Sequence, residues 1–383
     1  MPETDLGGIK SISGEELVST TSYVKWEGRY EYVTNQDTGD MVYLYHTATG
    51  FTVDFIGTEL EVDFYHTKKD LYFNVSVDGE PMPNTNENRT FFLSKDQTES
   101  TVKLVSGLKN KRHTLTCLKM SEAPDGYSAV KAIRTNGKLI ERNFEDDNSR
   151  FKFMFVCASG GSGHGSLSIG SSSGGVPRTT KNSSSLHSFN YLTARQFDAD
   201  VQYVSTSGWG VKYPKSIYEV FDYTGITPSN SVSGAKTTAL WNHQSWIPDV
   251  IIFNIGGNDT TANGFDANVY KQTVVSLVNK LHTLYPGARM IWTHTNSNAG
   301  KYAIAALTDA DIMSKNWIIE SIIPKVGQGE TGIGTYGANN HNSIKTHIDT
   351  AKILADDLAN TWGYVKVKDN IVYEDYSHLV SKP

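Results

Sequence analysis

Short apolar runs separated by Gly, Asp and Asn turns fill the first 145 residues. The runs are rich in β-branched and aromatic residues, and many alternate apolar with polar positions, which is the period of a half-buried strand. Asp78-Gly79, between two of them, is typical of a hairpin turn. The pattern predicts an all-β domain over residues 1–145, a sandwich or jelly roll. The runs occupy residues 41–45, 52–55, 61–65, 72–77, 101–105 and 113–118.

After the charged segment 141–148, which we interpret as a linker, the pattern changes. Residues 151–157 and 248–255 are nearly continuous apolar runs, typical of strands buried on both faces. Residues 268–285 repeat apolar positions every three to four residues, as an amphipathic helix does. The alternation predicts an α/β domain over residues 150–383, with helices on both faces of a mostly parallel sheet. Further strands are expected at 201–206 and 288–293, and further helices at 186–197 and 343–361.

The charge pattern excludes several classes of partner. The formal net charge is −6, and the sequence contains no run of Lys and Arg. This argues against a nucleic acid or an anionic membrane surface as partner. No apolar stretch reaches the roughly 18 residues of a spanning helix, so we expect no membrane insertion. The first residues lack the basic start and apolar stretch of a signal peptide, so either export by that route is absent or the signal has been removed.

The two cysteines, Cys117 and Cys157, fall in different predicted domains. We therefore expect two free buried thiols rather than a disulfide. No cluster of Cys and His has the spacing of metal ligands. We expect neither a metal site nor a cofactor.

Candidate chemistry begins at Ser159, directly after the first apolar strand of the second domain. Fourteen of the residues 159–175 are Gly or Ser, a composition that alone would predict a flexible linker. The segment follows a core strand without a break, however, and Gly163 and Gly165 suit a tight turn that exposes a hydroxyl. Ser159 is thus a candidate nucleophile, provided that a base takes its proton. Ser162, one turn later, is the competing candidate.

Two later strands end in residues that can donate hydrogen bonds. Gly208 follows one strand, and Asn258 follows the next within Gly-Gly-Asn-Asp. The carboxyl ends of parallel strands meet at one edge of a sheet, so a backbone N–H and an amide could converge on the oxyanion of an acyl-transfer reaction. His341, just before the last helix, is the candidate base. Other histidines that remain candidates are His164, His187 and His347.

The four segments that contain Ser159, Gly208, Asn258 and His341, in this order along the chain, resemble those of the SGNH (GDSL-type) hydrolases. The closer resemblance is to carbohydrate esterase family 2, whose members are two-domain deacetylases with a jelly-roll domain before the SGNH domain. It covers nearly the whole chain. The matching segments are residues 155–159 with Gly163 and Gly165, 207–210, 241–250 leading into 256–259, and 341–347 in the second domain, and residues 107–108, 113–115 and 119–123 in the first.

This resemblance implies a carbohydrate O-acetyl esterase that acts on an acetylated polysaccharide or oligosaccharide. Ser159 would attack the acetyl carbonyl, and His341 would move the proton. The N–H groups of Ser159 and Gly208 and the side chain of Asn258 would hold the oxyanion. Asn339, or a carbonyl near it, would orient His341. Candidates for contacting the sugar are Trp209, Trp241, Gly257 and Asp259, and an extracellular location is expected.

Three departures from the family pattern leave an alternative open. Cys157 and Ala158 replace the Gly and Asp before the nucleophile, Ala338 and Asn339 stand where an acid should orient the base, and Asn342 replaces the Pro that often follows the His. Loss of that carboxylate costs about 10⁴ in the rate of a full triad, although some family members are thought to use a Ser-His dyad with a backbone carbonyl. The alternative is a catalytically weak or inactive glycan-binding protein, such as a phage tail component. A virion-associated, active deacetylase of host-wall glycan is also compatible with the sequence.

Overall fold

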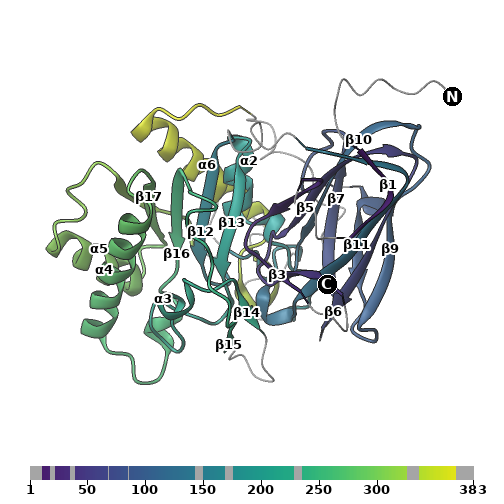
Figure 1. Ribbon diagram of the computed structural model, residues 1–383. Coiled ribbons are helices and arrows are strands. Elements are labelled where there is room, and N and C mark those ends of the chain that lie inside the picture. Colours follow the sequence, from purple (N-terminus) through teal and green to yellow (C-terminus); the bar gives the residue numbers. More distant parts are fainter. Residues whose placement is uncertain are drawn as a thin grey trace.

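The computed structural model of the chain contains a β domain followed by an α/β domain, packed side by side (Figure 1). The predicted linker lies mostly outside the described residues, so the predicted domain limits stay a prediction. The structure describes residues 11–17, 22–34, 39–67, 69–84, 86–142, 150–168, 176–227, 235–325 and 336–367.

The first domain is built from antiparallel strands, as the alternation of apolar and polar residues predicts. β10 lies between β5 and β7, and its Leu115 and Cys117 are fully buried in the domain core. The all-β prediction is confirmed, and the jelly-roll topology stays a prediction. The strands are β1 (Ser11–Leu17), β2 (Val24–Glu27), β3 (Tyr30–Val33), β4 (Met41–Leu44), β5 (Gly50–Gly57), β6 (Leu60–His66), β7 (Leu71–Val77), β8 (Thr90–Leu93), β9 (Glu99–Val105), β10 (Lys111–Lys119) and β11 (Ser128–Ile140), with 3-10 turns η1 (Glu87–Arg89) and η2 (Ala123–Asp125).

The second domain contains a parallel sheet with the strand order β13-β12-β16-β17-β18. Alternate residues of β12 face opposite sides. Phe153 and Phe155 join the core beneath α2 (Phe189–Gln196) and α6 (Ile344–Trp362), while Met154 and Val156 join the core beneath α4 (Ala267–Leu284). The predicted two-sided burial is therefore confirmed. The strands are β12 (Lys152–Cys157), β13 (Asp200–Ser205), β16 (Val250–Asn254), β17 (Arg289–His294) and β18 (Ile318–Ile322), and a small separate hairpin pairs β14 (Ile226–Thr227) with β15 (Ala235–Lys236).

The helices follow the predicted positions, and the structure adds the short helix α3 and the helix α5. The predicted helix 186–197 is split into a 3-10 turn and α2, because Ser188 caps α2 through its side chain. The strand β18 was not predicted from the sequence pattern either. The helical segments are η3 (Ser185–His187), α2 (Phe189–Gln196), α3 (Ile217–Val220), η4 (Asp259–Thr261), α4 (Ala267–Leu284), α5 (Asn298–Asp309), η5 (Ala338–Asn340) and α6 (Ile344–Trp362).

The two domains share a polar, well-connected interface. Arg29 of the β domain is fully buried, and its Nε donates to Gln202 Oε1 at 3.0 Å. Tyr30 packs edge-on against Trp241, with ring centroids 5.9 Å apart. Lys25 pairs with Asp200 at 2.7 Å. Contacts of this kind fix one domain against the other and let the β domain reach the edge of the parallel sheet.

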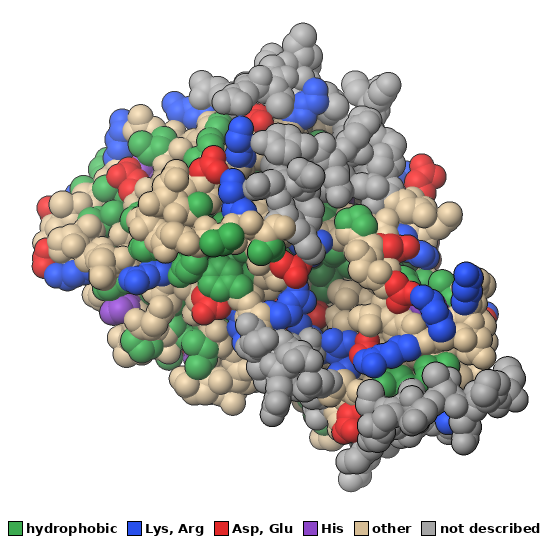
Figure 2. Space-filling view, turned by 90° about the horizontal axis from the view of Figure 1, so that it is seen from above, with side chains coloured by type: hydrophobic (Ala, Val, Ile, Leu, Met, Phe, Trp, Pro, Cys, Tyr) green, Lys and Arg blue, Asp and Glu red, His purple; other side chains and the backbone are tan. Residues whose placement is uncertain are grey.

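Basic and acidic side chains are interspersed on the face shown in Figure 2, and neither sign covers it. This agrees with the absence of Lys and Arg runs in the sequence. None of the helices in the described ranges is long and apolar enough to cross a membrane.

Candidate active site

Ser159 stands at the end of β12, in a turn that only glycine permits. Gly163 and Gly165 have φ values of +72° and +66°, in the left-handed region that favours glycine. A Cβ on Gly163 would lie 2.0 Å from the backbone oxygen of Ser184. The N–H of His164 donates to the Ser159 carbonyl at 3.2 Å and closes the turn. The sequence-based expectation of a tight, ordered turn is thus met by the backbone.

The segment before α6 packs directly on this turn. The N–H of Ala338 donates to the Gly165 carbonyl at 2.9 Å, so a side chain on Gly165 would collide with Ala338. Asn339 adopts a left-handed conformation with φ +51°, which Asn tolerates better than most residues. This bend turns the His341 ring back toward Ser159.

Ser159 and His341 are hydrogen-bonded to each other. The Ser159 Oγ lies 2.8 Å from Nε2 of His341, and Nδ1 of the same ring lies 2.8 Å from the backbone oxygen of Asn339. A carbonyl oxygen can only accept, so Nδ1 carries the hydrogen and Nε2 is free to accept the serine proton. This is the geometry of a nucleophile, a base and an orienting group.

The surroundings keep His341 in its neutral form. Burial lowers the pKa of His341 below its ordinary value, and its electrostatic interaction with His164 lowers it further. The Asn339 carbonyl and Glu122 act in the opposite direction, while Arg178 adds to the lowering. A neutral imidazole at neutral pH is what a general base requires.

The oxyanion candidates follow the ends of three neighbouring strands. Asn258 Nδ2 donates to the Trp209 carbonyl at 2.7 Å, which ties the loop after β16 to the loop after β13. This leaves the second hydrogen of the amide for another acceptor. Gly208 has φ +83°. Within the part of the chain that the structure describes, the N–H groups of Ser159 and Gly208 have no hydrogen-bond acceptor.

Asp259 holds a backbone loop, and its predicted contact with substrate stays a prediction. Its carboxylate is fully buried and accepts the backbone N–H groups of Val211, Lys212 and Tyr213 at 2.7–2.8 Å. Asp259 therefore braces the loop that follows Gly208. Its neighbour Gly257 is exposed.

The two tryptophans expected to stack on sugar rings are buried. Trp209 is 4% exposed and Trp241 is 8% exposed. Trp209 belongs to the apolar core on one side of the sheet, and Trp241 packs against Tyr30 and Arg29 of the β domain. Neither ring therefore offers an open face to a sugar. The sequence-based expectation failed because the position of a Trp in the sequence does not reveal whether its ring is covered.

The competing nucleophile and two of the competing bases have structural roles. Ser162 is fully buried and donates to the Ala158 carbonyl at 2.9 Å. His187 is bonded to the Ser184 hydroxyl at 2.7 Å. His347 accepts the N–H of Phe189 at 3.1 Å, and burial lowers its pKa to about 3.

Sequence reasoning missed an acidic group at the site. Glu122, from the β domain, lies 2.7 Å from Nδ1 of His164, and it also accepts a hydrogen bond from Ser207. The His164 ring lies against His341, with ring centroids 4.4 Å apart. Arg178 contacts Glu122 at 3.2 Å. Residues 119–123 matched the family only as part of the first domain, and no local pattern indicates that Glu122 reaches the second.

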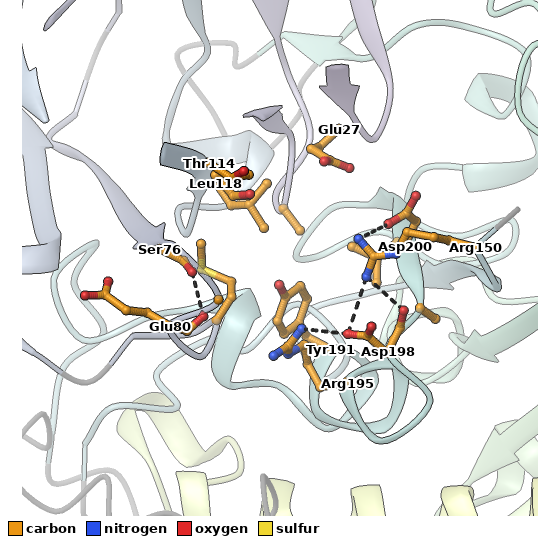
Figure 3. A pocket seen from close by; sticks show the side chains of 16 residues that line it. Glu27, Ser76, Glu80, Thr114, Leu118, Arg150, Tyr191, Arg195, Asp198 and Asp200 are labelled. Atoms are coloured by element: carbon orange, nitrogen blue, oxygen red, sulfur yellow. Dashed lines mark hydrogen bonds and ion pairs between the residues drawn. The ribbon is translucent and has the colours of Figure 1, made fainter. Parts of the chain in front are cut away.

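A separate cavity of about 300 Å³ lies between the domains near the amino end of β13, away from Ser159. Figure 3 shows residues of the β domain on one side, including Glu27 and Leu118, facing residues of the α/β domain. Its charged side chains pair with one another, as Arg150 does with Asp200 at 3.1 Å. The cavity thus belongs to the polar interface between the domains rather than to the site around Ser159.

Both cysteines are free and buried, as predicted. Among the described residues, no group of three or more His, Cys, Asp or Glu side chains could hold a metal ion.

Comparison with known proteins tests the predicted resemblance. Residues 28–141 match the family model described as carbohydrate esterase 2 N-terminal. The cellulase/esterase CelE of Acetivibrio thermocellus is 26% identical over an alignment of 336 residues, which covers 80% of this chain and 37% of that protein. The predicted resemblance to carbohydrate esterase family 2 is confirmed. The acetylxylan esterase/glucomannan deacetylase of Cellvibrio japonicus is 27% identical over an alignment of 140 residues, which covers 32% of this chain and 36% of that protein.

The fold of family 2 is shared as well. A family 2 carbohydrate esterase from Clostridium thermocellum, solved in complex with cellohexaose, has a TM-score of 0.73 and 24% identity to this chain. The likeness covers 89% of this chain and 100% of the other. It confirms the two-domain fold, with an antiparallel β domain before a parallel α/β domain. The chain spans little more than a third of the length of the curated relatives it matches, 37% and 36%.

Proposed function

We propose that the chain is a carboxylic ester hydrolase that removes O-acetyl groups from carbohydrate. The observation that carries this proposal is the 2.8 Å contact between Ser159 Oγ and His341 Nε2, with Nδ1 of His341 held by the Asn339 carbonyl. The kinship with family 2, whose relatives are named esterases, supports the reaction class.

The proposed reaction has two halves. In the first, the Ser159 hydroxyl gives its proton to His341 Nε2 while Oγ bonds to the acetyl carbon. The carbonyl oxygen becomes an oxyanion, held by the N–H groups of Ser159 and Gly208 and by the amide of Asn258. One such donor is typically worth 10²–10³ in rate. As the bond to the sugar oxygen breaks, His341 returns the proton to that oxygen, and the sugar leaves as an alcohol.

In the second half, water attacks the acetyl group on Ser159. His341 takes a proton from the water, the same donors hold the oxyanion, and the proton returns to Oγ as acetate leaves. No step needs a carboxylate beside His341, because the Asn339 carbonyl fixes the tautomer. The imidazolium formed in each half lacks a directly bonded negative partner, which lowers the expected rate below that of a full triad.

The substrate class rests on the relatives. The Cellvibrio japonicus protein is named an acetylxylan esterase and glucomannan deacetylase. We propose an acetylated plant-type polysaccharide, or an oligosaccharide from it, as the substrate of this chain. A polysaccharide is too large to enter cells intact, so we propose that the protein acts outside them.

A second candidate function is glycan binding without turnover. A structural relative was solved with cellohexaose, a glycan without acetyl groups. Together with the replaced Gly-Asp pair before Ser159, this keeps a weak or inactive binding protein as the alternative, including a virion-associated one.

Acetate release from a panel of acetylated polysaccharides tests the proposal, with Ser159→Ala as the control. We expect release by the wild-type protein and a loss of at least about a thousandfold in the variant. Unchanged binding of deacetylated glycan, with no acetate release by the wild type, would support the binding protein instead. Equal release by both proteins would rule out Ser159 as the nucleophile.

A further inference from the structure

One carboxylate of the β domain reaches the reaction site. Glu122 lies between β10 and η2 and is 1% exposed. One of its oxygens is 2.7 Å from Nδ1 of His164, and the other accepts the Ser207 hydroxyl. His164 belongs to the nucleophile turn and Ser207 to the loop after β13, so a single side chain of one domain holds two loops of the other.

His164 transmits this contact to the base. Its ring lies against the ring of His341, with centroids 4.4 Å apart and an angle of 45° between the planes. Glu122 fixes Nδ1 of His164, so that the ring cannot turn away from His341. The position of the His341 imidazole is thus limited on one side by His164 and on the other by the Asn339 carbonyl.

Ser207 transmits the second contact to the oxyanion loop. Ser207 directly precedes Gly208, whose N–H is the proposed oxyanion donor. Its hydroxyl is also 3.1 Å from Nδ1 of His164. Glu122 and Ser207 both contact Nδ1 of His164. In a catalytic triad the acid and the serine bind opposite nitrogens of the imidazole, so that the acid orients the ring and the other nitrogen takes the serine proton. His164 does not have this arrangement. Ser207 is therefore an anchor and not a second nucleophile.

We propose that Glu122 is a positioning residue of the catalytic site, acting through His164 on His341 and through Ser207 on the oxyanion donor Gly208. The β domain then completes the site instead of only flanking it. This inference rests on the proposed esterase function.

The charged groups around Glu122 and His164 support this positioning role. Burial by itself raises the pKa of Glu122, but its interactions with His164 and Arg178 outweigh this effect and lower the pKa below the ordinary value. Arg178 also binds Asp125, which Lys69 contacts at 3.3 Å. Glu122 is thus ionised at neutral pH and can hold both hydrogen-bond donors strongly.

The main test compares Glu122→Gln with Glu31→Gln. Glu31 of β3 accepts the Thr224 hydroxyl at 2.9 Å across the same domain interface, away from the site, so the two variants make the same chemical change. We expect Glu122→Gln to lower kcat for acetyl-ester hydrolysis by about tenfold to a hundredfold, with KM changed by less than about twofold. Glu31→Gln should keep the wild-type kcat.

A second test addresses the link to His341 directly. His164→Phe keeps a ring against His341 but removes the electrostatic interaction by which His164 lowers the His341 pKa. In an NMR titration, the midpoint of the His341 imidazole should therefore move to higher pH, and the acid limb of kcat/KM should move with it. A ring that only fills space would leave both midpoints unchanged.

The outcomes separate this inference from the esterase proposal. If the wild-type protein releases no acetate, the proposed function fails, but the NMR titration of His341 still tests the link through His164. If Ser159→Ala is inactive while Glu122→Gln keeps the wild-type kcat, only the inference is overturned. Should Glu122→Gln fail to fold, His164→Phe and Ser207→Ala each remove one of its two contacts. Wild-type kcat in both, with an unmoved His341 midpoint, would also overturn it.

Discussion

Nδ1 of His341 lies 2.8 Å from the backbone oxygen of Asn339, not from a carboxylate. The side chain of Asn339 is exposed, and only its main chain contributes to the site. A backbone carbonyl fixes the tautomer of the base as an Asp side chain does, but it carries no charge that would stabilise the imidazolium. The Asn339 carbonyl therefore replaces the acid of the family pattern in orienting His341, but it does not replace the negative charge of that acid.

This relationship predicts a small effect of Asn339→Asp. The exposed side chain does not touch His341, and Asp tolerates the left-handed conformation at φ +51°. We expect kcat/KM for an acetyl ester to stay within about threefold of wild type, since a solvated charge near the imidazolium adds little. Asn339→Ala is the matched variant, which should lower the free energy of unfolding by about 1 kcal/mol through backbone strain. A loss of activity in Asn339→Asp with the fold intact would indicate that the Asn339 side chain contacts the substrate.

The pKa of His341 predicts how activity depends on pH. Only the neutral imidazole accepts the Ser159 proton, so activity rises as pH increases through the pKa of His341. Burial and the electrostatic interaction with His164 lower this pKa, so the rise should be centred below 6.5, the ordinary value. A profile of kcat/KM against pH between 4 and 9 measures the midpoint. A midpoint above 7 would contradict the inferred environment of His341.

The chain's local pattern predicted the parts of the site that sit at strand ends. Ser159, Gly208 and Asn258 each follow an apolar run, and parallel strands necessarily bring such ends to one edge. His341 was predicted from its position before the last helix. The hydrogen bond between Ser159 and His341 joins residues 182 positions apart, and their pairing was predicted through the family resemblance rather than from the local pattern.

Contacts that depend on how the domains pack could not be predicted in this way. Glu122 and His164 belong to different domains, and no periodicity relates them. The burial of Trp241 likewise depends on a contact between the domains, because Tyr30 of the β domain packs against its ring. Helix α5 was missed for a local reason: its buried face consists largely of small residues such as Ala299 and Ala303, which give a weak apolar signal.

Two buried histidines predict a loss of stability in acid. Burial lowers the pKa of His347 and that of His46 to about 3, so both are neutral in the folded protein. The unfolded chain binds their protons near pH 6.5, so stability decreases as pH falls below 6.5, by up to about 1.4 kcal/mol per pH unit for each group. Thermal unfolding between pH 7 and 4 measures the slope. His347→Gln should reduce the slope, and an unchanged slope would mean that His347 is protonated in the fold.

The role of Asp259 separates bracing from substrate binding. Its carboxylate accepts three backbone N–H groups of the loop after Gly208, and Asp259→Ala would leave these buried donors without an acceptor. We expect the free energy of unfolding to fall by about 1–3 kcal/mol. We also expect kcat to fall because the Gly208 donor loses its fixed position, while KM changes little. Melting curves and steady-state kinetics on one acetylated oligosaccharide give all three values. A raised KM with unchanged melting temperature and kcat would mean instead that Asp259 binds the sugar, as the sequence alone had suggested.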